Sequence, residues 1–133
     1  MDDVLIVGDG PAGLSAALFL SKKEMNVKVF GQDGTLMHKA NVLNYLGIPE
    51  VTGSEFQRIS RDQVRSFGAS IIEAEVTTAE KNDNGFKIVD SDGNIHEAAY
   101  LILATGPSNP LAEALGVGKG DEGMLSDRYG RTT

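Results

Sequence analysis

The apolar positions near the N-terminus follow two different spacings. Residues 4–7 (VLIV) form a continuous apolar run, which is typical of a parallel strand buried on both faces. Residues 11–22 then predict a helix, because Pro11 suits a first helical turn and small residues keep its inner face thin. A second short strand is expected at residues 27–30, so the segment has the order and size of a βαβ unit.

The middle of the chain predicts a loop followed by a second helix. Residues 35–53 have no regular apolar spacing and contain several turn formers, so we expect an ordered loop. Ser54 is the expected N-cap of the helix, since Gln57 follows at capping-box spacing, and Gly68 is expected to end it. The residues expected on its buried face are Phe56, Ile59, Val64 and Phe67.

The pattern then changes to short strands joined by turns. Residues 74–79, 86–89 and 95–98 are β-like runs separated by the hairpin turn sequences NDNG and SDGN. Residues 100–104 form one more continuous apolar strand, which ends in a glycine turn within ATGPSNP. Ligands of open α/β sheets collect at such carboxyl ends of strands.

These elements predict an α/β domain with a three-layer ββα Rossmann-like fold for FAD or NAD(P). The parallel sheet is expected to contain residues 4–7, 27–30 and 100–104, and the antiparallel meander over 74–98 is expected to pack as a separate small sheet. The whole chain, residues 1–133, is expected to form a single domain.

Composition and charge narrow the classes of function. The chain carries 12 Lys and Arg against 19 Asp and Glu, a net charge of -7, with no basic cluster, so we expect no nucleic-acid partner. It contains no cysteine and therefore supplies no thiol chemistry of its own. The first apolar run stops at Gly8, so we expect no signal peptide or membrane span and predict a cytoplasmic protein. We also expect no metal site.

A glycine-rich turn joins the first strand to the first helix. Gly8, Gly10 and Gly13 have the spacing of a dinucleotide-binding turn inside a βαβ unit. The first glycine allows a tight bend, the second lets the backbone approach a pyrophosphate, and amides near Ala12 and Gly13 donate to it. We therefore expect a dinucleotide here, with Asp9 turned towards solvent, because its carboxylate would repel the pyrophosphate.

This turn by itself does not choose between FAD and NAD. The dinucleotide fingerprint expects an acidic residue roughly twenty positions further on, where it accepts a hydrogen bond from a ribose. Gly31 stands at that place, followed by Gln32 and Asp33. Asp33 suits a ribose ligand and an ordinary turn residue equally well, so both interpretations stay open on the residues alone.

Longer stretches of the chain carry a family resemblance. VLIVGDGPAGLSAALFLSKKEMNVKVF, NVLNYLGIPEVTGSEF, a β-meander and AAYLILATGPSNP follow one another over residues 4–110, which is most of the chain. In this order they resemble the FAD-binding half of the thioredoxin reductase family of pyridine-nucleotide disulfide oxidoreductases. The resemblance implies that the cofactor is FAD and that the protein is a flavoprotein, and it assigns no catalytic residue.

The same resemblance implies a set of cofactor-contacting residues. It implies that the glycine turn binds the pyrophosphate of FAD and that the segment after the second strand binds the adenosine ribose and the start of the ribityl chain. A loop asparagine is implied near the flavin, a residue of the first meander strand near the adenine, and the ATG turn beside the cofactor. In that order the implied residues are Gly10, Pro11 and Ala12; Gly31, Gln32, Asp33 and Leu36; Asn44; Val76; and Thr105 and Gly106. Gly8 and Gly13 complete the predicted site.

The C-terminal part departs from the family pattern. Thioredoxin reductases continue into a second nucleotide domain that binds NADPH and carries a Cys-x-x-Cys pair, and this sequence has neither. Residues 115–133 instead resemble the strand that follows that domain in the family. The family's later Gly-Asp motif, which holds the ribityl chain, is not reached. We therefore expect either a domain that is incomplete at its C-terminal end or a site without its flavin-side wall.

Two hypotheses of function follow. In the first, the chain is a flavoprotein oxidoreductase or its FAD-binding domain, served by a separate electron-donor or acceptor protein. In the second, it is a non-catalytic module or subunit that binds FAD or NAD. The family resemblance favours the first hypothesis, while the lack of a hydride-donor domain and of cysteine favours the second. A homodimer is expected, because members of the family commonly pair.

Three further side chains bear on the chemistry. His38 and His96 are the only histidines, and both are expected at the surface, although the loop of His38 should pass near the flavin. Tyr45 is expected to be a buried aromatic residue that anchors its loop. Ser15, Ser108 and Ser126 have no neighbouring histidine and acid in the pattern of a nucleophile.

Overall fold

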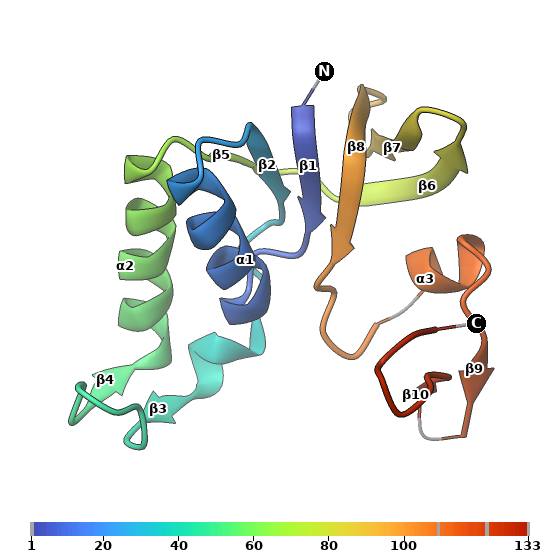
Figure 1. The fold of residues 1–133 in the computed structure, drawn as a ribbon. Helices are drawn as coiled ribbons and strands as arrows, with labels where there is room; N and C mark the ends of the chain where they lie inside the picture. Colours follow the sequence, from blue (N-terminus) through green and yellow to red (C-terminus); the bar gives the residue numbers. More distant parts are fainter. Residues whose placement is uncertain (1, 109, 122, 133) are drawn as a thin grey trace.

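The computed structural model describes residues 2–108, 110–121 and 123–132 and shows two long helices lying together beside a sheet (Figure 1). The strands of this sheet are β1 (Asp2–Val7), β2 (Val27–Phe30), β5 (Ser70–Ile72), β6 (Val76–Asn82), β7 (Gly85–Asp90) and β8 (Ile95–Leu103). The helices are α1 (Pro11–Lys22), α2 (Gly53–Ser66) and α3 (Pro110–Ala114), with a 3-10 turn η1 (Leu36–Lys39). The short strands β3 (Asn41–Val42), β4 (Val51–Thr52), β9 (Lys119–Gly120) and β10 (Gly123–Met124) form two small ladders.

The six-stranded sheet has the order β5-β2-β1-β8-β7-β6. Its first four strands are mutually parallel, and β7 and β6 continue it in antiparallel fashion. The βαβ unit that the sequence predicts is confirmed, with α1 and β2 at the expected bounds. Strand β5 was not predicted, because a three-residue strand at the edge of the sheet has too short a pattern to be recognised.

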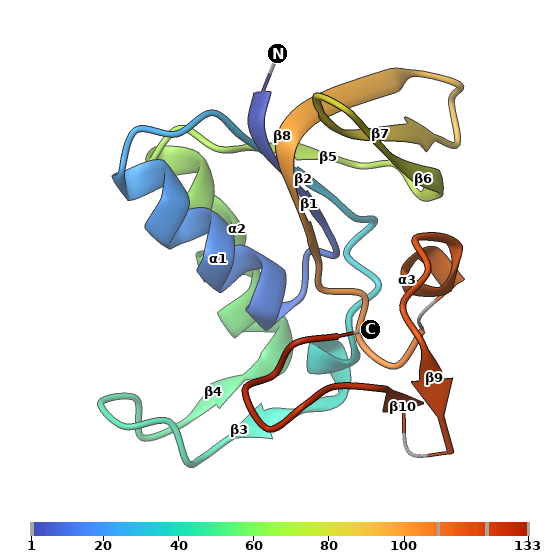
Figure 2. The same ribbon diagram turned by 45° about the vertical axis from the view of Figure 1, so that its right-hand side comes forward.

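The prediction of a separate meander sheet is wrong. Strand β8 runs without interruption through both predicted segments, pairing Phe86 of β7 with Ala98 and Val4 of β1 with Tyr100. The strand bends along its length, and β7 and β6 turn away from the parallel strands, as Figure 2 shows. The meander is therefore an extension of the main sheet that folds over one of its faces.

Two apolar cores lie on opposite faces of β1, as expected for a strand buried on both sides. Val4 and Ile6 belong to the core that contains Leu14 of α1 and Val64 of α2. Leu5 and Val7 belong to the other core, with Val76, Ala79 and Ile88 of the meander and Leu111 of α3. Each fully buried side chain of this size contributes roughly 1.5–3 kcal/mol of transfer free energy. Helices, parallel strands and meander thus form the three expected layers.

Helix α2 begins earlier than predicted and turns a different face inward. Its N-cap is Thr52, whose hydroxyl accepts a hydrogen bond from the Glu55 amide at 3.2 Å, so the capping box is shifted from the predicted Ser54. Of the four side chains expected to be buried, only Val64 is; Ile59 and Phe67 are exposed and Phe56 is half-buried. The buried residues of α2 are Gly53, Gln57, Arg61 and Val64.

The polar residues on this buried face reflect what lies opposite it. Positions three and four apart on a helix share one face. Gln57 and Arg61 on this face contact Asp9 in the glycine turn, while Val64 packs in the apolar core. Residues 35–53 are mostly irregular, as predicted, with η1 and the β3–β4 hairpin inside them. Within the described residues, no helix has the length and apolar character needed to cross a lipid bilayer.

Candidate functional site

The glycine turn between β1 and α1 is packed too tightly for side chains at two of its positions. Gly8 has φ +110°, and a β-carbon on it would lie 2.0 Å from the carbonyl oxygen of Ala104 at the end of β8. A β-carbon on Gly13 would lie 1.9 Å from the carbonyl oxygen of Gly8. The turn therefore lies directly against Ala104 at the end of β8, and the first turn of α1 lies directly against Gly8, which leaves room for glycine alone at both positions.

The N-terminus of α1 is open towards that surface. Its N-cap, Gly10, provides no side-chain hydrogen bond, and the first turn contains no acidic residue. The first amides of a helix have no acceptor within the helix and carry the positive end of its dipole. Pro11 lacks an amide hydrogen, so the amides of Ala12 and Gly13 are the donors available to an anion. Thr35 borders the turn, with Oγ1 3.1 Å from the place of a Gly10 β-carbon.

Hydrogen bonds bring the carboxyl ends of four parallel strands to the same edge of the sheet. The Gly8 amide donates to Phe30 O at 2.8 Å, the Gly31 amide to Ile72 O at 3.1 Å, and the Ala104 amide to Val7 O at 2.7 Å. The glycine turn, the segment after β2 and the turn after β8 therefore meet there, as parallel α/β topology requires of a ligand site. Thr105 and Gly106 belong to this last turn, in which the Thr105 hydroxyl donates to Ser108 O.

The segment after β2 is held in a defined conformation. Asp33 has φ +55°, and its amide donates to Oδ2 of Asp9 at 3.1 Å. Nε2 of His38 donates to Asp33 O at 3.0 Å, and Nδ1 of the same ring lies 2.7 Å from Oγ of Ser54 on α2. His38 is exposed, as expected, yet it links this segment to α2. Gln32 and Leu36 are exposed beside it.

The expectation that Asp9 faces solvent is wrong. Asp9 is 5% exposed and its carboxylate pairs with the guanidinium of Arg61, which is 6% exposed. The Gln57 side-chain amide donates to Asp9 O, and Arg61 also reaches Oε1 of Glu73 at 2.7 Å. The charge of the Asp9 carboxylate is thereby compensated within the protein by Arg61.

Sequence reasoning missed Gln57, Arg61 and Thr35 as residues of this site. Gln57 and Arg61 lie four positions apart on α2, so they share a face, but their spacing also suits an ordinary solvated helix surface. Their partner Asp9 is 52 residues from Arg61 in the chain. No local pattern joins residues at such a separation, and only the packing of α2 against the turn does so.

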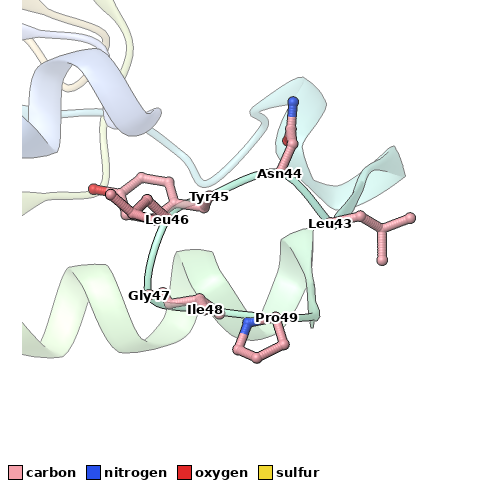
Figure 3. A pocket seen from close by; sticks show the side chains of 7 residues that line it. All are labelled: Leu43, Asn44, Tyr45, Leu46, Gly47, Ile48 and Pro49. Carbon is pink, nitrogen blue, oxygen red and sulfur yellow. The ribbon is translucent and has the colours of Figure 1, made fainter.

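Two of the predicted residues stand apart from the glycine turn. Asn44 lies in the β3–β4 loop, where residues 43–49 curve around a hollow of about 460 Å³; Figure 3 shows Leu43, Asn44 and Tyr45 pointing away from one another. Tyr45 is 56% exposed and packs obliquely on Phe56, so the expectation of a buried anchor is wrong. The Val76 side chain is buried in the core that also contains Leu5 and Val7 of β1.

Comparison with known proteins decides the family. The family model of the pyridine nucleotide-disulphide oxidoreductases matches residues 2–132. The chain belongs to this family. Thioredoxin reductase of Aquifex aeolicus is 32% identical over 108 residues, which make up 78% of this chain and 33% of that protein. A component of the alkyl hydroperoxide reductase of Staphylococcus aureus is 31% identical over 107 residues, 78% of this chain and 21% of that protein.

Solved structures of the same family share the fold. The atypical thioredoxin reductase TRi from Desulfovibrio vulgaris Hildenborough superposes with a TM-score of 0.74 and 33% identity, over 81% of this chain and 37% of that chain. Thioredoxin reductase of T. acidophilum gives a TM-score of 0.71 and 35% identity, over 77% of this chain and 34% of that chain. The chain thus spans about a third of the length of the thioredoxin reductases that it matches.

Family membership resolves the choice of dinucleotide. Thioredoxin reductases and their relatives in this family are FAD-binding flavoproteins, and the chain is an FAD-binding, oxidoreductase-related module of the same kind. The site fits such a cofactor, because the α1 N-terminus is uncapped and free of acidic residues, and the close packing at Gly8 and Gly13 holds the turn that leads into it.

Proposed function

We propose that the chain forms the FAD-binding part of a flavoprotein oxidoreductase that exchanges electrons with a separate donor or acceptor protein. The observation that carries this proposal is the uncapped N-terminus of α1, which opens on a glycine turn at the carboxyl ends of β1, β2 and β8. Backbone amide donors and the positive end of the helix dipole meet there, an arrangement that favours binding of an anion. A pyrophosphate fits this position, since it is the negatively charged centre of a dinucleotide.

The residues that would hold FAD divide by the part of the cofactor that they serve. The turn from Gly8 to Gly13 would bind the pyrophosphate, and Gly31, Gln32, Asp33 and Leu36 would bind the adenosine ribose and the ribityl chain. The Val76 side chain is packed in the core, so its backbone would meet the adenine. Asn44, Thr105 and Gly106 would lie on the flavin side. When bound, FAD would supply the electron-transfer chemistry of the module.

The electrons would have to pass to or from groups outside this chain. The 133 residues contain no cysteine, so the chain has no dithiol with which to reduce a disulfide. The relatives that it matches are named as thioredoxin reductases and as a component of alkyl hydroperoxide reductase, and the chain spans about a third or less of their length. A redox partner therefore belongs to the proposal. Its identity would be tested by comparing the rates at which different donor proteins reduce the bound flavin.

The proposal is tested by titrating the 133-residue chain with FAD and then with NADPH under anaerobic conditions. We expect a bound-flavin absorption spectrum, slow or absent bleaching by NADPH alone, and no reduction of a disulfide substrate. Bleaching should become fast when a competent donor protein is added. A chain that is folded yet does not bind FAD would contradict the proposal, and so would NADPH-driven disulfide reduction by the chain alone.

A second candidate function is a non-catalytic FAD-binding subunit. The absence of cysteine from the chain favours it, because the protein would then store or carry the cofactor rather than turn over a substrate. The same titration separates the two candidates. A carrier would hold FAD that no donor protein reduces at a useful rate, whereas the module of an oxidoreductase would be reduced and reoxidised repeatedly.

Assembly and location complete the proposal. We propose a homodimer in the cytoplasm. The exposed apolar side chains of the β3–β4 loop support a dimer, since Leu46 is 99% exposed, Leu43 63% and Tyr45 56%, and a second copy would remove them from water. Light scattering would give the mass in solution, and fractionation of the source cells would give the location. A monomer with these side chains exposed would contradict the dimer.

A further inference from the structure

One carboxylate of the glycine turn contacts three separate parts of the site. Oδ2 of Asp9 receives the guanidinium of Arg61 on α2 and the amide of Asp33 after β2. A β-carbon on Gly31 would lie 2.3 Å from Cγ and Oδ1 of the same carboxylate, so the carboxylate fills the space beside Gly31. Asp9 therefore joins the turn, the segment after β2 and helix α2 through a single buried group.

Helix α2 holds this carboxylate from two directions. Arg61 binds the Asp9 side chain, and Gln57, one helical turn earlier, donates to the Asp9 carbonyl oxygen. Both side chains are buried, and Oε1 of Gln57 has no hydrogen-bond partner. An orphaned buried carbonyl costs free energy, so this amide orientation is maintained by its contact with Asp9. Glu73 holds the far side of the guanidinium at 2.7 Å.

Asp33 is the group on which this arrangement acts. It occupies the left-handed region with φ +55°, a backbone conformation that is unfavourable for a residue other than glycine and persists when the surroundings impose it. The hydrogen bond from its amide to Asp9 imposes that conformation directly, and the hydrogen bond from His38 to its carbonyl oxygen does so from the other side. The Asp33 carboxylate itself lies beside the same histidine, with Oδ1 3.1 Å from Nε2 of His38.

We propose that Asp9 is a positioning residue for recognition of the adenosine ribose, with Arg61 as the group that holds its carboxylate in place. This inference rests on the proposed function, in which Asp33 binds the ribose. The acidic residue that the fingerprint expects at the end of the second strand is replaced here by Gly31. The carboxylate that fills the space beside Gly31 comes from the glycine turn instead, and it sets the neighbouring Asp33.

A buried ion pair with a purely structural role would behave differently under substitution. Replacing both partners of such a pair with uncharged residues often leaves stability unchanged or raises it, because the cost of desolvating two charges disappears. The double variant Asp9→Ala with Arg61→Met is therefore expected to fold. Asp9→Ala also removes the acceptor for the Asp33 amide, so recognition of the ribose should fail while the fold persists.

The test compares ADP with 2′,3′-dideoxy-ADP, two ligands that share the pyrophosphate and adenine but differ in the ribose hydroxyls. Affinities of the 133-residue chain are measured by calorimetry, and folding by circular dichroism. The wild type is expected to bind ADP about tenfold more tightly than the dideoxy analogue, as a hydrogen bond to a charged group predicts. Asp9→Ala with Arg61→Met is expected to bind both with nearly equal, weaker affinity.

Three further variants isolate the cause. Asp9→Asn with Arg61→Met keeps an acceptor for the Asp33 amide and should retain most of the preference for ADP. Gly31→Ala keeps both charges but displaces the Asp9 carboxylate, so the preference should fall. Arg58→Met, on the same helix but paired with Glu55 and Asp62 at the surface, should leave the preference as in the wild type.

The outcomes separate the two proposals. A wild type that binds FAD and ADP but does not distinguish ADP from the dideoxy analogue would overturn the role of Asp9 alone. The same holds if Asp9→Ala with Arg61→Met, or Gly31→Ala, folds and keeps the full preference for ADP. A folded wild type that binds neither FAD nor ADP would overturn the proposed function itself. If Asp9→Ala with Arg61→Met fails to fold, Asp9→Asn with Arg61→Met decides the question, because a folded variant that has lost the preference for ADP would overturn the role of the acceptor at position 9.

Discussion

Nε2 of His96 lies 2.9 Å from Oδ2 of Asp90, whose side chain is only 1% exposed. The ring of His96 also packs edge-on against Phe30, with the ring centres 4.8 Å apart, and its side chain is 12% exposed. The expectation of a surface histidine is therefore wrong for His96. The amides of Asp92 and Asn94 donate to Oδ1 of Asp90 at 2.9 and 3.0 Å, so the carboxylate organises the β7–β8 turn.

This arrangement predicts a loss of stability in acid. The hydrogen bond from His96, followed by those from the Asn94 and Asp92 amides, holds the pKa of Asp90 below its ordinary value of 3.8. A carboxyl whose pKa is lowered by folding stabilises the protein above its unfolded pKa, and this contribution disappears as the pH falls through the folded value. Thermal unfolding should therefore occur at lower temperature as the pH falls below about 4.

The variant Asp90→Asn should flatten this dependence, since its amide cannot titrate. Circular dichroism melts between about pH 7 and about pH 3 would measure the effect. Asp92→Asn is the matched control, because Asp92 contacts Asp90 through its backbone amide, which the substitution retains. An Asp90→Asn protein with the same acid dependence as the wild type would show that other carboxylates dominate it.

Gly8 should be intolerant of any side chain. Gly8→Ala combines a positive φ with a β-carbon 2.0 Å from Ala104 O, so we expect the free energy of unfolding to fall by more than about 3 kcal/mol. Gly93→Ala is the matched control, since Gly93 also has a positive φ, +82°, but its β-carbon would meet nothing within 4 Å. It should cost only the conformational strain, about 1–3 kcal/mol. Equal losses in denaturant titrations would refute the tight packing at Gly8.

Gly10 should tolerate a side chain structurally but not functionally. A β-carbon there would lie 3.1 Å from Thr35 Oγ1, a contact that a small movement of Thr35 relieves. Gly10→Val is therefore expected to fold and to lose bound FAD, because the side chain occupies the space that a pyrophosphate needs. Combining it with Thr35→Ala removes the steric conflict and should restore stability without restoring FAD. Full flavin content in either folded variant would show that the pyrophosphate binds somewhere other than beside Gly10.

Thr52, rather than Ser54, should control the start of α2. Thr52→Ala removes the acceptor for the Glu55 amide and should lower the free energy of unfolding by about 1 kcal/mol. Ser54→Ala leaves this cap intact and loses only an exposed hydrogen bond to His38, so its effect should be smaller. Chemical denaturation of both variants measures the difference. If Ser54→Ala were the less stable of the two, Ser54 would be the N-cap, as the sequence predicts.

Local patterns determined those parts of the fold whose signals lie close together in the chain. The bounds of α1 and β2 follow from the sequence, because Pro11, the small residues after it and a short apolar strand act over a few residues. The glycine turn follows from the same region, since its steric need for glycine and its place between strand and helix are both local. The family resemblance extended this to the cofactor, which family membership supports.

Tertiary structure alone decided the features that depend on distant partners. Strand β8 is one element because β7 and β1 both pair with it, and β5 is a strand because β2 lies beside it; neither pairing leaves a mark in the local pattern. Arg61 is buried because Asp9, 52 residues earlier, brings a compensating charge to it. Burial of a charged residue depends on the oppositely charged partner that it contacts in the folded protein, and local sequence patterns do not identify a partner so far away in the chain.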